Sequence, residues 1–112
     1  MEELLENIQE FIESGEENLR KQRFNAAVSD FFKAIVIICD YLIYKEIKII
    51  PKNHNERFSI LEKYFRDTYK KVAELFQIYI KSYNSRSTKE EAQILKKYAY
   101  EIKQNITNKK QT

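Results

Sequence analysis

The stretch Phe24–Tyr44, FNAAVSDFFKAIVIICDYLIY, decides the fold of this 112-residue chain. Its apolar residues recur at spacings of three and four, which is the period of one face of an α-helix. From Ala34 onward the stretch is apolar nearly all round. Such a helix must be surrounded by others, or must also meet a second subunit. The stretch therefore predicts the central helix of a helical bundle.

The segment before this stretch repeats the helical period. Apolar residues from Leu4 to Leu19 lie on one face, which predicts a helix from Glu2 to about Lys21. Gly15 falls on the same face. A glycine there allows a neighbouring helix to approach closely, although it also permits a bend.

The segment after it begins with NHNERF, residues 53–58, which is typical of a helix start: Asn53 can cap free N–H groups, and Glu56 can bond back. The helical period then continues to Tyr83. One helix over residues 54–83 would be long for a small domain. We expect a break near FRDTYK, residues 65–70, with Asp67 or Thr68 as the cap of a fourth helix, although the period alone allows one helix.

A last helix is predicted by a capping box from Thr88 to Glu91 and by a stripe of inward apolar residues. The stripe consists of Ala92, Leu95, Ala99, Ile102 and Ile106. Gly and Pro occur once each, and 43% of residues are hydrophobic. These features predict one all-α domain over residues 1–107, an antiparallel bundle of four to five helices, followed by a flexible polar tail over 108–112.

Composition narrows the chemistry. The single cysteine, Cys39, lies in an apolar run and is expected to be buried, and no paired Cys or His pattern predicts a metal site or a cofactor. The acidic N-terminus and the lack of a long apolar run predict a cytoplasmic protein that does not enter a membrane. Residues 1–17 hold seven Glu and no Lys or Arg, so the remainder is basic. A basic remainder could hold a polyanion or could simply be a solvated surface.

The only histidine, His54, stands beside the only proline. The positive end of a helix dipole and the nearby Lys52 and Arg57 favour its neutral form near pH 7, in which it could act as a base. With Lys48 and Asn53 these cations could hold a phosphate at the helix start. A surface capping histidine is the alternative.

The order of these features resembles the HEPN domain family of small helical bundles. The likeness is carried by RFNAAVSDFFKAIVIICDYLIYKE, by PKNH at the start of the third helix, and by YNSRSTKEEA before the last one. The resemblance implies a homodimer that brings two copies of a polar site together. It also implies either a metal-independent endoribonuclease of a toxin and antitoxin system, or a non-catalytic partner of a minimal nucleotidyltransferase.

Catalytic family members use an Arg, four to six residues, and then a His. On that pattern His54 would transfer the proton, and Lys48, five intervening residues earlier, would stand in place of the Arg. Four further residues could support the site. Asp40 could orient a catalytic group, or it could face solvent or pair with a nearby Lys. Tyr79, Tyr83 and Arg86 could border the same cleft, or Tyr79 and Tyr83 could continue the core stripe with Arg86 as an ordinary loop cation.

Two functions follow as hypotheses. In the first, a HEPN-like dimer binds nucleotide or RNA at the His54 end, and binding falls when Lys48, Lys52 or His54 is replaced by Ala. In the second, the protein is a non-catalytic interaction module whose apolar second helix binds itself or another protein, and a charge at Ile37 abolishes that association.

Overall fold

The computed structural model describes the backbone of residues 1–111 and the side chains of residues 1–107. Over that part the chain forms five helices: α1 (Glu2–Arg20), α2 (Phe24–Ile47), α3 (His54–Tyr64), α4 (Arg66–Lys81) and α5 (Lys89–Gln111). The predicted flexible tail over residues 108–112 concerns residues whose side chains lie outside the described part, and it stays a prediction.

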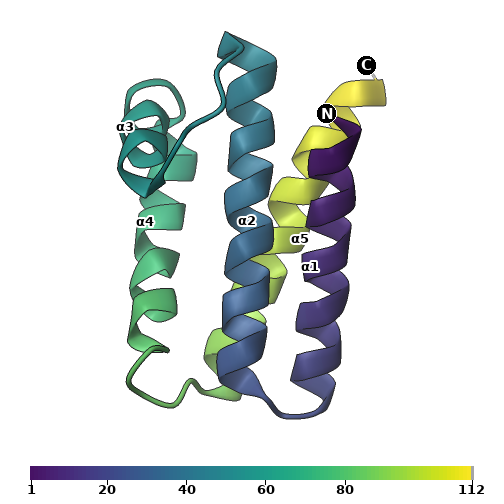
Figure 1. Cartoon of the computed structure of the whole chain (residues 1–112), viewed down its shortest axis with the longest axis vertical. Helices are drawn as coiled ribbons and strands as arrows, with labels where there is room; N and C mark the ends of the chain where they lie inside the picture. Colours follow the sequence, from purple (N-terminus) through teal and green to yellow (C-terminus); the bar gives the residue numbers. More distant parts are fainter. Residues whose placement is uncertain (112) are drawn as a thin grey trace.

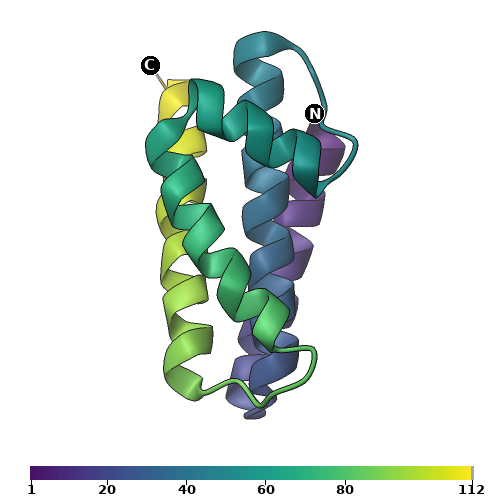
Figure 2. The same ribbon diagram turned by 90° about the vertical axis from the view of Figure 1, so that its left-hand side faces the viewer.

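Helix α2 lies at the centre, as its apolar surface predicts. It packs against all four other helices. Figure 1 shows α1 and α4 running opposite to α2 and α5, and Figure 2 shows α3 crossing one end of this antiparallel group. The side chains of Phe31, Phe32 and Ile35 on α2 are almost fully buried. The predicted all-α bundle is confirmed, with five helices.

Gly15 is the point where α1 and α2 approach most tightly. A methyl group on Gly15 would lie only 2.7 Å from the ring of Phe31, which is fully buried. Because heavy atoms essentially never come this close, a larger residue would force the two helices apart. The reason predicted for this glycine is confirmed, and α1 continues through it to Arg20.

Helix α1 ends in a Schellman motif without glycine. Arg23 N–H donates to the carbonyl of Asn18, Gln22 N–H donates to that of Leu19, and Gln22 takes the left-handed conformation at φ 60°. Lys48, at the end of α2, is also left-handed, at φ 59°. Both positions are ones where glycine is usual, so sequence rules give no signal for these two turns.

The predicted break in the third helical segment is confirmed, but its predicted cap is wrong. Phe65 interrupts the helix and serves as the N-cap of α4, while Asp67 and Thr68 lie inside the first turn. The Phe65 side chain is partly buried against the core. No side chain caps α4, so the break lies at a residue that packs on the core and not at a polar capping residue. This break turns α3 across the bundle.

Both predicted caps of the other helix starts are present. The Asn53 side chain accepts the N–H of Glu56 at 2.9 Å. Thr88 and Glu91 bond reciprocally, at 2.9 and 3.1 Å, which completes the capping box of α5. The five inward residues predicted for α5 are all buried.

Candidate functional site

A buried ion pair joins the middle of the central helix to α3. The Arg57 guanidinium donates from Nε to Asp40 Oδ1 at 2.7 Å and from Nη2 to Asp40 Oδ2 at 3.0 Å. Both residues are only 8% exposed. Asp40 was predicted to face solvent, to pair with a nearby lysine or to orient a catalytic group, and it is held by an arginine 17 positions away. Arg57, expected to hold a phosphate, already donates from two of its nitrogens to Asp40.

The same guanidinium reaches the histidine. Arg57 Nη1 lies 3.0 Å from Nδ1 of His54. A guanidinium has no acceptor atom, so Nδ1 must be the unprotonated nitrogen of a neutral imidazole. Asp40, Arg57 and His54 therefore form one hydrogen-bonded chain from the core to the surface.

Aromatic rings pack beside His54. Its ring centroid lies 5.4 Å from that of Phe76, 6.1 Å from that of Phe58 and 6.4 Å from that of Phe32. Partial burial lowers the pKa of His54, the positive charge of Arg57 lowers it further, and the negative charge of Asp40 opposes both. The neutral form predicted from sequence is favoured, chiefly by burial and then by the charge of Arg57, which the sequence prediction named.

This shift makes the stability of the protein depend on pH. A histidine whose pKa is lower in the folded state stabilises the fold fully above its unfolded value, near 6.5, and loses that contribution as the pH falls through the folded value. We expect wild-type protein to lose stability between pH 7 and pH 5 relative to His54→Asn, whose amide oxygen lies on Cγ as Nδ1 does and can accept from Arg57. The difference should be small, because His54 is only partly buried and much of the residue is exposed to solvent.

Thermal unfolding of both proteins at several pH values checks this expectation. Glutamates whose pKa is lowered by lysine, such as Glu91 beside Lys81, affect both proteins alike and cancel in the comparison. Parallel stability curves for the two proteins over this range would contradict it.

His54 opens onto a groove of about 400 Å³ between α1, α2, α3 and α4, called here the His54 groove. It combines aromatic, aliphatic and cationic side chains. Its lining consists of Phe11, Phe32, Lys33, Val36, Ile37, Lys52, Asn53, His54, Arg57 and Tyr79.

The groove has an aromatic wall and cations beside it. Tyr79 stacks on Phe32 with 4.7 Å between ring centroids and 13° between the ring planes. Lys33 lies over the ring of Phe11, 5.5 Å from its centroid. Lys52 is exposed at the start of α3. Aromatic surface and ammonium groups thus face one concave space.

Of the residues predicted for this site, the structure brings together Asp40, Lys52, Asn53, His54 and Arg57. Lys48 is not among the lining residues of the groove. It is exposed, and its ammonium lies 5.5 Å from the ring centroid of Tyr44 on its own helix. The structure therefore shows no contact that joins Lys48 to His54.

Tyr83 and Arg86 line a different hollow, of about 350 Å³, at the loop between α4 and α5. Tyr83 is 74% exposed, and its hydroxyl lies 2.7 Å from that of Tyr79. This hydrogen bond, together with partial burial, raises the pKa of Tyr79 to about 12. Tyr79 is thus shared between core and groove, whereas Tyr83 projects outward rather than continuing the core stripe.

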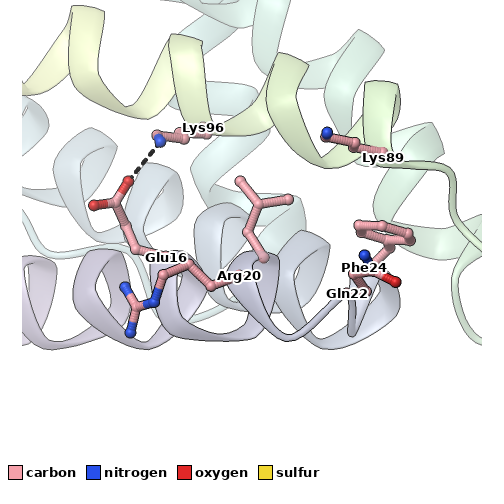
Figure 3. A pocket seen from close by; sticks show the side chains of 7 residues that line it. Glu16, Arg20, Gln22, Phe24, Lys89 and Lys96 are labelled. Atoms are coloured by element: carbon pink, nitrogen blue, oxygen red, sulfur yellow. Dashed lines mark ion pairs between the residues drawn. The ribbon is translucent and has the colours of Figure 1, made fainter.

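A second large hollow, of about 440 Å³, lies between α1 and α5. Figure 3 shows Lys96 of α5 paired with Glu16 of α1, while Lys89 lies at the other end of the hollow, on the side of Gln22 and Phe24. Glu16 and Lys96 form an ion pair at 2.7 Å, and this contact lowers the pKa of Glu16. The pair neutralises two of the charges there, and Arg20 and Lys89 are exposed. The His54 groove differs from this hollow because a buried ion pair, Asp40 with Arg57, lies behind it, and we therefore take it as the candidate site.

Sequence reasoning did not predict five lining residues of the His54 groove, namely Phe11, Phe32, Lys33, Val36 and Ile37, whereas Tyr79 was one of the residues predicted to border the cleft. Aromatic residues at helical spacing are usually core, so the first two carried no separate signal. Lys33 did carry one, because it is the only Lys or Arg between Phe24 and Tyr44. A lone cation in such a run marks the solvent-facing line of the central helix.

These observations define the class: a small all-α protein of five helices with a groove beside a buried Asp–Arg–His chain. Comparison with protein-family models, curated proteins and solved structures finds no match to this chain. The resemblance to HEPN domains therefore rests on the helix order and on the short motifs named above.

Two further findings concern the described residues only. Within that part of the chain, no three His, Cys, Asp or Glu side chains gather so that they could hold a metal ion. No helix there combines the length and the apolar character needed to cross a membrane.

Proposed function

We propose that the His54 groove binds a nucleotide, either free or as a unit of single-stranded RNA. One observation carries the proposal: a concave space of about 400 Å³ that is lined by the half-buried rings of Phe11 and Tyr79 together with several cationic or donor groups. Ligand sites commonly have this size and this mixture of apolar wall and few polar groups. A nucleotide presents the matching features, a flat base and an anionic phosphate.

The arrangement suits the two halves of a nucleotide separately. The base would pack against the ring of Tyr79, which is only half-buried, because base stacking on aromatic rings tolerates any base. The phosphate would lie near Lys52 and Lys33, which are both exposed. Their ammonium groups act as compact positive charges. Single-stranded RNA is commonly recognised through such unstacked bases and phosphate contacts.

The test is equilibrium binding of uridine monophosphate and of a short fluorescent oligouridine at low salt. We expect Lys52→Ala to weaken binding by about tenfold, the loss of roughly one charge-assisted contact. Lys97→Ala, which removes an equally exposed lysine far from the groove in sequence, is the matched control. Equal affinity of wild type, Lys52→Ala and Lys33→Ala for both probes would overturn the proposal.

The alternative function, self-association without a ligand, is favoured by a separate observation. Ile49 and Ile50, directly after α2, are 47% and 50% exposed. In the predicted homodimer, a second copy of this chain would cover these two residues. Ile37 is a poor probe of it, because Ile37 also lines the His54 groove. Light scattering of the same protein samples separates the two functions. A protein that stays monomeric at all concentrations would reject self-association and would leave the nucleotide-binding proposal unaffected.

A further inference from the structure

The chain of hydrogen bonds behind the groove determines what His54 can offer a ligand. Arg57 Nη1 points its N–H at Nδ1, so the proton of the neutral ring must sit on Nε2. Among the described side chains, no hydrogen bond engages Nε2. The histidine therefore presents an N–H donor and has no free lone pair.

We propose that Asp40 and Arg57 are positioning residues that hold His54 as a hydrogen-bond donor, so that the groove recognises acceptor oxygens and performs no proton abstraction. Asp40 holds the guanidinium by two bonds of 2.7 and 3.0 Å. A planar guanidinium held on two nitrogens has a fixed direction for the third. The aromatic neighbours of His54 limit rotation of the ring from the other side.

This arrangement has a chemical consequence. A metal-independent ribonuclease needs a base that takes the proton of a ribose 2′-hydroxyl, and a base must carry a lone pair toward that proton. Here the lone pair of the imidazole is directed at Arg57, and the free nitrogen carries a proton. A neutral imidazole N–H is also a poor acid. The groove is therefore suited to holding the oxygens of a phosphate, not to cleaving the chain.

The part of this inference that concerns a ligand rests on the function proposed above, whereas the state of His54 does not. The state can be measured in the free protein by long-range ¹H–¹⁵N NMR of the single histidine at neutral pH. We expect a pyridine-type signal for Nδ1 and a pyrrole-type signal for Nε2. A protonated Nδ1 in the wild type would overturn the inference while leaving nucleotide binding untouched.

The role of the two positioning residues is tested by Asp40→Leu combined with Arg57→Met. This double variant removes one negative and one positive charge, so the net charge of +3 is kept. We expect Nδ1 to gain partial protonation, as in an unrestrained imidazole, and the affinity for uridine monophosphate to fall about tenfold, the value of one hydrogen bond to a charged group.

Glu62→Leu with Arg66→Met is the matched control, since both residues are exposed and neither touches His54. It should keep the wild-type signals and affinity. An Nδ1 signal in the folded Asp40 and Arg57 double variant identical to that of wild type would overturn the positioning role. Should the double variant not fold, the wild-type signals alone still decide the protonation of His54. Cleavage of oligouridine by wild type in a chelator, lost in His54→Ala, would also overturn the inference.

Discussion

Arg57→Met should destabilise the protein by about 3–5 kcal/mol, because it leaves the Asp40 carboxylate buried without its partner. Small domains are stable by only about 5–15 kcal/mol, so this single change should remove a large part of the total. Chemical denaturation followed by circular dichroism at neutral pH measures it. Loss of any cooperative transition would correspond to the upper end of the range.

The companion measurement is the double variant Asp40→Leu with Arg57→Met. Replacing both partners of a buried ion pair by apolar residues is often neutral or stabilising, since no charge is left desolvated. We therefore expect the double variant to be far more stable than Arg57→Met alone, which gives a strong coupling in a double-mutant cycle.

Arg66→Met, at an exposed position, is the matched control and should change stability by less than about 0.5 kcal/mol. If Arg57→Met changed stability by no more than that, the ion pair would not stabilise the fold. Asp40 could then not be what holds Arg57 in place beside His54.

Asn25→Ala should cost about 2–4 kcal/mol, the sum of three lost hydrogen bonds and one stranded donor. The Asn25 amide donates to the carbonyls of Ser82 and Ser85, each at 2.9 Å, and its oxygen accepts the N–H of Ser87 at 2.6 Å. Ser87 is buried. One side chain at the start of α2 thus bonds to three residues of the connection between α4 and α5.

Unfolding by denaturant and hydrogen exchange of the Ser87 amide measure this effect together. In Asn25→Ala we expect the amide to exchange much faster than its neighbours in α5, because its acceptor is gone. Asn84→Ala, an exposed asparagine in the same loop, should leave both quantities near wild type. Unchanged protection of Ser87 in Asn25→Ala would show that the loop is held by other contacts.

Much of the fold is predictable from the sequence because helices are made by local forces. The periods of α1, α2 and α5, the capping box of Thr88 and Glu91, and the close approach at Gly15 are all visible in residues three or four apart. The site is less predictable. His54, Lys52 and Asn53 lie together at the start of a helix, as the sequence indicates. Lys48 itself takes the left-handed conformation at the end of α2, and the sequence has no glycine there from which this turn could be predicted.

The sequence by itself determined an all-α bundle with an apolar central helix and a histidine at the start of a helix, and it indicated a break near residues 65–70. Only the tertiary structure decided that Arg57 turns inward to Asp40, that Asn25 holds a loop about 60 residues away, and that Nδ1 of His54 lies within hydrogen-bond distance of Arg57. The physical reason is the distance along the chain over which each interaction acts. Period and capping depend on neighbours within one turn, whereas a buried charge finds its partner only after the helices have packed and excluded water.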